Sequence, residues 1–174
     1  MQSRNELGKL FQEHNELGIG AEVGCYAGDF SKTLSQDYKG KILSIDYFDS
    51  KDFLYDDKLE ERCREILKDT NCEVVKSDSI EYSKLVPDES LDFVYIDADH
   101  RYETAKADIE AWFPKVRKGG IVSGHDYIKD YIVSGQEFGV WKAVDEFCSN
   151  NGYKFNLIPD LVSGANFASW YFIK

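Results

Sequence analysis

Apolar residues along the chain follow two different spacings. Leu7, Leu10 and Phe11 recur at helical intervals in a polar segment, which predicts an amphipathic helix ending near residues 15–18. From residue 19 onward, short apolar runs alternate with polar stretches that carry helical stripes. This alternation predicts right-handed β–α–β crossovers and a mostly parallel sheet with helices on both faces. The runs are Ile19–Val23, Ile42–Ile45, Glu73–Val75, Leu91–Ile96 and Gly120–Val122.

The C-terminal segment breaks this alternation. Lys154–Ile158 and Phe167–Ile173 both have the pattern of strands, and the chain between them leaves no room for a crossover helix. We therefore expect these two strands to pair antiparallel. The predicted fold class is α/β, a doubly wound, mostly parallel sheet of seven strands with a C-terminal antiparallel hairpin. We expect a single domain over residues 1–174, with an N-terminal helix in 1–18 and the core in 19–174.

Composition excludes several classes of partner and compartment. The 174 residues include 21 Lys and Arg against 32 Asp and Glu, a formal charge of −11, which disfavours nucleic-acid and membrane-surface partners. The four cysteines form no C-x-x-C pair, which is typical of a reduced, cytoplasmic chain. No apolar run is long enough to span a bilayer or serve as a signal peptide. We expect small-molecule partners, and homo-oligomer formation stays open.

Candidate binding residues lie where strands end, because open α/β sheets bind ligands at the carboxyl ends of their strands. Gly24 follows the first strand and permits a tight turn, and Gly28 lets a ligand approach closely, although an ordinary strand-to-helix turn has the same pattern. Asp46 ends the second strand 22 residues after Gly24, near the spacing at which an acid binds the ribose of an adenosine cofactor. Its alternative role is capping the next loop.

Two further positions extend this candidate cofactor site. Tyr47 and Phe48 follow Asp46 and could cover an adenine face. Asp78 follows the third strand, where it could accept a hydrogen bond from the adenine amino group. A helix N-cap at Asp78 would have the same sequence pattern, so both roles stay open.

Longer motifs carry a family resemblance. Glu-Val-Gly-x-x-x-Gly at 22–28, then Ile-Asp at 45–46 and Ser-Asp at 77–78, resembles the class I S-adenosylmethionine-dependent methyltransferases, which have a Rossmann-like fold. The blocks Leu91–Tyr102 and Gly119–Tyr127 look like those of a bacterial metal-dependent branch that includes sugar and natural-product O-methyltransferases. The resemblance covers nearly the whole chain from Ile19.

The resemblance implies positions for the cofactor. It places the methionine end of S-adenosylmethionine near Glu22 and the loop from Gly24 to Gly28, and the ribose on Asp46. Tyr26 stands where many members have a middle glycine, and the catechol-type branch is similar to this chain in lacking that glycine.

The resemblance also implies a metal ligand at Asp97, a second ligand from the block at 119–127, and a base at His100. We also expect Asp97 to be a catalytic residue and to contact the cofactor. A divalent ion on Asp97 and Asp126 would lower the pKa of a substrate hydroxyl, and a histidine with a pKa of about 6.5 suits proton removal. Magnesium prefers oxygen ligands, so an imidazole ligand at His125 would shift the site towards a transition metal. Otherwise His125 is a base or a substrate contact, and Asp126 binds the metal alone. Structural alternatives are a water-facing His100, and His125 and Asp126 that satisfy backbone groups.

These residues predict a methyltransferase acting on a small-molecule or sugar hydroxyl. One alternative is a non-catalytic S-adenosylmethionine-binding domain. Another is a short-chain NAD(P)-dependent dehydrogenase, because Tyr102 and Lys106 have the Tyr-x-x-x-Lys spacing of that chemistry. The position of Tyr102 after the fourth strand, the terminal hairpin and the missing third glycine argue against the dehydrogenase.

Overall fold

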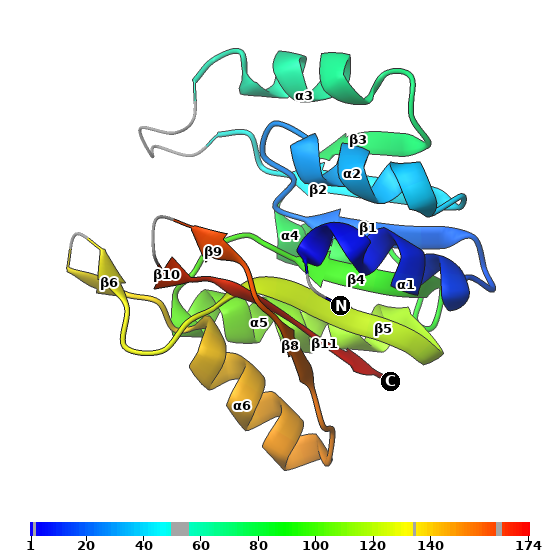
Figure 1. Ribbon diagram of the computed structural model, residues 1–174. Helices are drawn as coiled ribbons and strands as arrows, with labels where there is room; N and C mark the ends of the chain where they lie inside the picture. The colour runs from blue at the N-terminus through cyan, green and yellow to red at the C-terminus, as the bar shows by residue number, and fades with distance from the viewer. Residues whose placement is uncertain (2, 50–55, 134, 163–164) are drawn as a thin grey trace.

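Seven strands form the central sheet of the computed structural model, which describes residues 1, 3–49, 56–133, 135–162 and 165–174. Their order is β3-β2-β1-β4-β5-β11-β8 (Figure 1). The first five strands run parallel, and β11 pairs antiparallel with both β5 and β8. This confirms the predicted fold class. The strands are β1 (Ile19–Val23), β2 (Lys41–Asp46), β3 (Cys72–Lys76), β4 (Leu91–Ile96), β5 (Val116–Tyr127), β8 (Asn156–Ile158) and β11 (Ala168–Ile173).

Helices cover both faces of this sheet because successive strand residues point to opposite sides. In β4, Phe93 and Tyr95 pack towards α1 and α2, whereas Val94 and Ile96 pack towards α5 and α6. Contacts of α3 with α2 and β3 place it on the first side, and α4 contacts α5 on the second. The helices are η1 (Arg4–Glu6), α1 (Leu7–Glu13), α2 (Asp29–Asp37), α3 (Leu59–Leu67), α4 (Ser79–Ser83), α5 (Tyr102–Trp112), η2 (Phe113–Lys115) and α6 (Val140–Asn151).

Aromatic packing fixes the N-terminal helix on the sheet. The rings of Phe11 and Phe93 stack with centroids 3.9 Å apart, and Tyr38 meets Phe93 edge-on at 5.0 Å. Gly20 leaves room for this ring, since a Cβ there would lie 2.0 Å from Cε1 of Phe93. Burying a large aromatic side chain in this way stabilises the fold by about 2–3 kcal/mol per ring. The predicted amphipathic helix therefore packs through its apolar stripe.

Two short antiparallel strand pairs lie at the end of the sheet where the parallel strands end. β6 (Ile132–Val133) pairs with β7 (Gln136–Glu137) in the aromatic stretch after β5, and β9 (Leu161–Val162) pairs with β10 (Ala165–Asn166). The start of β11 lies beside the end of β5, because Ala168 is the register partner of Tyr127. Both strand pairs therefore lie at the carboxyl ends of the parallel strands.

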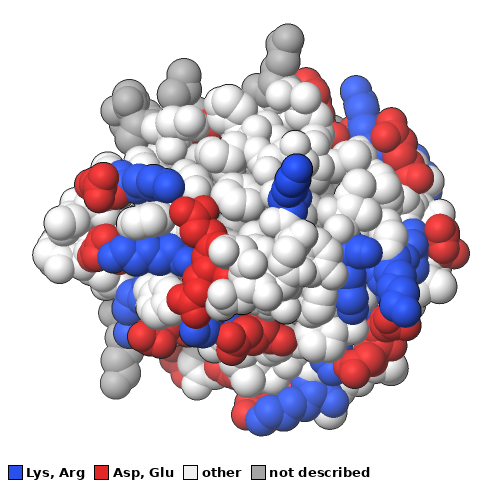
Figure 2. Space-filling view, turned by 90° about the horizontal axis from the view of Figure 1, so that it is seen from below, with Lys and Arg blue, Asp and Glu red and all other residues white. Residues whose placement is uncertain are grey.

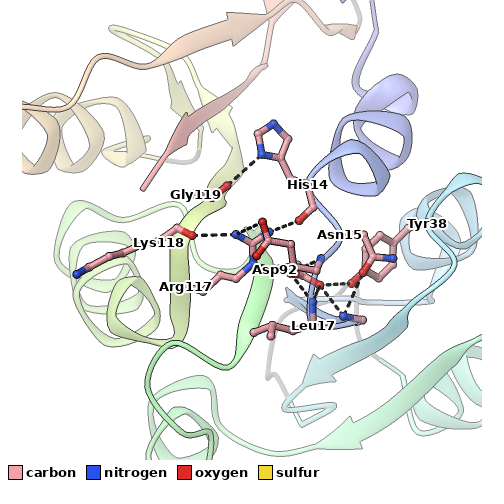
Figure 3. A network of polar contacts seen from close by, with 10 residues as sticks. His14, Asn15, Leu17, Tyr38, Asp92, Arg117, Lys118 and Gly119 are labelled. Carbon is pink, nitrogen blue, oxygen red and sulfur yellow. Dashed lines mark hydrogen bonds and ion pairs between the residues drawn. The ribbon is translucent and has the colours of Figure 1, made fainter.

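A buried carboxylate binds the N-terminal segment to the sheet where β4 begins, at the end away from the carboxyl ends of the parallel strands (Figure 3). Asp92 accepts hydrogen bonds from the backbone N–H groups of residues 16–18 at 2.7–3.0 Å, and from the Tyr38 hydroxyl at 3.1 Å. Nε of Arg117 donates to the same carboxylate at 2.8 Å. Hydrogen bonds and the guanidinium lower the pKa of Asp92 despite its burial. This network joins the start of β1, β4 and β5.

The surface mixes charges of both signs. On the face seen in Figure 2, acidic and basic side chains lie next to one another among broad uncharged areas, without forming a basic stripe. Within the part of the chain that the structure describes, no helix is both long enough and apolar enough to cross a membrane.

Candidate active site

The ends of β4 and β5 bring together the acids and the histidine that the sequence placed there. Ile96 is the register partner of Gly124, so Asp97 lies beside His125 and Asp126. Nδ1 of His125 lies 3.1 Å from Oδ1 of Asp126 and 3.7 Å from Oδ1 of Asp97. One ligand atom from each residue falls within 4.8 Å of the others, a spacing that could hold a metal ion.

His100 lies against this group from the loop that precedes α5. Its Nε2 is 3.0 Å from Oδ2 of Asp126, and the Phe138 ring stacks on the imidazole with centroids 4.4 Å apart. The backbone N–H of Gly139 donates to the carbonyl of His100 at 2.7 Å. A Cβ at Gly139 would lie 2.4 Å from the backbone nitrogen of Tyr102, so this close contact requires glycine. The start of α6 thereby positions His100.

Burial and mutual contacts shift the pKa values of the group. Burial raises the pKa of Asp97 to about 6, against the lowering effect of His125. Burial would raise the pKa of Asp126 too, but hydrogen bonds with His100 and His125 lower it well below its usual range. The same contacts raise the pKa of both histidines even though burial opposes this. Asp126 is therefore the firmly ionised member of the group.

Sequence reasoning missed two members of the site, Arg4 and Asp160. Nη1 of Arg4 lies 3.5 Å from Oδ2 of Asp97, and its Nε lies 3.1 Å from Oδ2 of Asp160. The same oxygen of Asp160 is 3.2 Å from Nε2 of His125. Arg4 precedes the first helix and carries no motif. Asp160 gave one weak signal, an acid in the turn before the strand that returns beside β5.

The end of β1 approaches this group closely. Gly24 has a φ of +87°, and a Cβ there would lie 2.2 Å from the carbonyl oxygen of Asp97. The Glu22 side chain is buried and accepts a hydrogen bond from the Ser31 hydroxyl. Burial raises the pKa of Glu22 to about 8, so this carboxyl is mostly protonated at neutral pH. Gly28, with a φ of +90°, is the N-cap residue of α2.

Asp46 joins the loops that follow β1 and β2. Its Oδ2 accepts the backbone N–H of Tyr26 at 2.8 Å, and its Oδ1 accepts that of Phe48 at 2.9 Å. This is the loop-capping role that the sequence left open. Each carboxylate oxygen has a second lone pair, so the contacts are compatible with ribose binding. The Tyr26 and Tyr47 side chains are exposed, whereas Phe48 is buried among the side chains near α3.

Two other predicted residues have structural partners. The Asp78 carboxylate accepts the backbone N–H of Glu81 at 3.0 Å and caps α4, the second role that the sequence allowed. The Tyr102 hydroxyl donates to Glu146, and Nζ of Lys106 lies 2.7 Å from the same carboxylate. Tyr102 and Lys106 thus connect α5 to α6, which removes the basis for a dehydrogenase.

Comparison with known proteins decides the family. A sequence profile described as a methyltransferase domain matches residues 21–127, more than half of the chain. The chain belongs to this family. Together with the seven-stranded sheet, the match identifies the chain as a methyltransferase domain with a Rossmann-like α/β fold. A curated relative, the uncharacterized protein y4gI of Sinorhizobium fredii, is 37% identical over 57 residues, which are 33% of this chain and 6% of that protein. The methyltransferase thus matches only a small part of that relative.

Solved structures share the fold at low identity. An O-methyltransferase from Bacillus cereus in complex with SAH has a TM-score of 0.71 and 16% identity, covering 97% of this chain and 80% of that one. Cofactor-bound Rv0187 from MTB has a TM-score of 0.73 and 16% identity, covering 97% and 79%. Precorrin-6y C5,15-methyltransferase from Geobacter metallireducens has a TM-score of 0.70 and 15% identity, covering 98% and 88%. The methyltransferase thus shares its fold with proteins named for different acceptors.

Proposed function

We propose that this methyltransferase transfers the methyl group of S-adenosylmethionine to a hydroxyl oxygen of a small molecule or sugar, assisted by a divalent metal ion. The observation that carries the proposal is the convergence of Asp97, His125 and Asp126 on one point, with His100 beside them. A base next to a set of metal-ligating atoms is what deprotonation of a weakly acidic hydroxyl requires. The cofactor, when bound, supplies an electrophilic methyl group.

The chain offers groups for each part of this cofactor. Glu22 and the loop from Gly24 to Gly28 would hold the methionine end, and Asp46 would accept hydrogen bonds from the ribose hydroxyls. Tyr47 is exposed beside Asp46, where it would cover the adenine, and Asp78 stays a candidate for the adenine amino group. The close approach of Gly24 to Asp97 supports this arrangement, since it brings the cofactor loop to the edge of the acidic group.

The donor set suits a metal ion with affinity for nitrogen. Asp97, His125 and Asp126 would supply two carboxylates and one imidazole, a set that favours a transition metal such as zinc or iron over magnesium. When bound, the ion would lower the pKa of the acceptor hydroxyl and fix its direction. Asp160 lies at Nε2 of His125 and would orient Nδ1 towards the two acids.

His100 is suited to remove the proton from the acceptor. Its side chain is 43% exposed, so an acceptor can reach it from solvent. Asp126 and the stacked Phe138 ring hold the imidazole in one orientation. Positioning the base and the acceptor in this way lowers the barrier without any covalent intermediate with the protein.

The test is methyl transfer to a broad panel of hydroxyl compounds, detected by mass spectrometry. We expect a methylated product from the wild-type chain, its loss on exhaustive chelation, and recovery when zinc or iron is added back. His100→Gln should lower turnover by about 100-fold or more while S-adenosylhomocysteine binding is kept. His14→Gln is the matched control, because His14 contacts Gly119 far from the site. Binding without transfer to any acceptor would favour the non-catalytic domain, and full activity after chelation would exclude the metal.

A further inference from the structure

Arg4 adds a guanidinium to the group of acids and histidines at the ends of β4 and β5. Within the described part of the chain, it is the Lys or Arg whose side chain forms an ion pair with Asp97 or Asp160. The two contacts differ in length. Nε lies 3.1 Å from Asp160, within hydrogen-bond distance, whereas Nη1 lies 3.5 Å from Asp97. Arg4 is thus held firmly by Asp160 and more loosely by Asp97.

Arg4 also contacts the helix that follows the cofactor loop. Its Cζ lies 4.9 Å from the centroid of the Phe30 ring, in the first turn of α2. That turn begins at Gly28, where the loop from Gly24 ends. The Arg4 side chain is 30% exposed, so a ligand can reach it. The cation–π contact and the Asp160 hydrogen bond hold the guanidinium beside the end of β4, where Nη1 lies 3.5 Å from Oδ2 of Asp97.

We infer that Arg4 binds the α-carboxylate of the cofactor and that Asp97 faces its α-ammonium group through Oδ2. The inference rests on the proposed function, because it assigns one end of the same cofactor. The amino-acid end of S-adenosylmethionine is a zwitterion, and an adjacent arginine and carboxylate present the complementary pair of charges. A guanidinium suits a carboxylate because its planar N–H groups match the two oxygens.

The two oxygens of Asp97 allow it to serve both halves of the site. Oδ1 faces His125, on the side of the proposed metal, and Oδ2 faces Arg4. Before the ligand arrives, Arg4 is neutralised by Asp97 and Asp160 and is not an unpaired buried charge. The ligand carboxylate would displace the longer contact with Asp97, while Asp160 keeps the guanidinium oriented.

The decisive experiment compares two ligands by titration calorimetry. S-adenosylhomocysteine carries the α-carboxylate, and its decarboxylated analogue keeps the ammonium group but lacks the carboxylate. We expect Arg4→Gln to weaken S-adenosylhomocysteine binding by about 10- to 100-fold, the range of a charge-assisted hydrogen bond. Binding of the decarboxylated analogue should stay within about twofold of wild type or tighten, since a competing cation is gone from Asp97.

Two further variants complete the design. Arg4→Lys keeps the charge without the planar fork and should lose less affinity for S-adenosylhomocysteine than Arg4→Gln. Lys9→Gln removes an exposed charge from the neighbouring helix and should bind both ligands as the wild type does. Circular dichroism and melting temperature monitor the fold of each variant.

Other outcomes would overturn the inference. Equal weakening of both ligands by Arg4→Gln would make Arg4 a structural latch between η1 and the sheet. Unchanged S-adenosylhomocysteine affinity would show that Arg4 does not contact the carboxylate. Failure of the wild-type chain to bind S-adenosylhomocysteine at all would overturn the proposed function, and this inference with it.

Discussion

Asp108 is a buried acid outside the site. Its hydrogen bond with Ser79 connects two helices, but burying its charge lowers the free energy of unfolding at neutral pH. It lies on the inner face of α5 and accepts a hydrogen bond from the Ser79 hydroxyl. Ser79 in turn accepts the indole N–H of Trp112 at 2.8 Å. These two hydrogen bonds join α4 to α5. Among the residues that the structure describes, no cation shifts the pKa of Asp108. Burial raises the pKa of Asp108 to about 6.

This raised pKa predicts a stability change with a defined sign. Below about pH 4, Asp108 is protonated in the folded and unfolded chains, so it causes no penalty. Between about pH 4 and pH 6 the unfolded chain loses the proton first, and the free energy of unfolding falls. Asp108→Asn keeps an acceptor for Ser79 and avoids the buried charge. Its stability relative to wild type should therefore be about 2–3 kcal/mol more favourable at pH 7 than at pH 4.

Urea unfolding at the two pH values measures this difference. Glu110→Gln is the matched control, because Glu110 is exposed on the same helix, and its effect on unfolding should not change between pH 4 and pH 7. A pH-independent effect of Asp108→Asn would mean that the acid is not buried as described. The sequence offered a hint here, since position 108 falls in the apolar stripe with Ala105, Ile109 and Trp112.

Individual strands differ in how well their bounds could be predicted. β1 and β4 begin and end at the predicted residues because they are short, continuous apolar runs. β5 extends over Val116–Tyr127, far beyond the predicted Gly120–Val122. Its extra residues include Arg117, which is buried only because Asp92 neutralises it. A local sequence pattern cannot predict that Arg117 is buried, because its partner Asp92 lies 25 residues away in the sequence.

Asp92→Asn should be severely destabilising because this buried carboxylate binds both the backbone of residues 16–18 and the Arg117 guanidinium. The change removes the buried counter-charge of the Arg117 guanidinium, leaves it with the exposed carboxylate of Glu16, and weakens the bonds to residues 16–18. We expect a loss of about 3–5 kcal/mol in the free energy of unfolding, measured in urea at pH 7. Cofactor affinity of the folded fraction should change little, because the network lies at the opposite edge of the sheet.

The chain contains a matched control for this prediction. Glu16 also pairs with Arg117, at 3.4 Å, but its side chain is 71% exposed. Exposed ion pairs contribute little, so Glu16→Gln should cost less than about 1 kcal/mol. Similar losses in the two variants would argue that burial is not the source of the Asp92 effect.

At the scale of the whole molecule, the alternation of strands and helices was enough to predict the parallel sheet, and its interruption near the C-terminus predicted the antiparallel hairpin. It also placed Asp97, His100, His125 and Asp126 at neighbouring strand ends, where the structure brings them together. Arg4 and Asp160 escaped prediction because each comes from a segment without periodicity. They lie at the site because α1 packs on the sheet and β11 pairs with β5. Contacts of that kind depend on the complete topology.

The same topology predicts that ligand binding stabilises the whole chain. Asp46 links the loops after β1 and β2, so a ligand bound to it should raise the free energy of global unfolding. At 100 times its dissociation constant, S-adenosylhomocysteine should add about 2.7 kcal/mol, raising the melting temperature by about 5–10 °C. Asp46→Ala should lose most of this rise, whereas Asp49→Ala, an exposed acid three residues away, should keep it. Scanning fluorimetry measures both, and an undiminished rise in Asp46→Ala would remove Asp46 from the cofactor site.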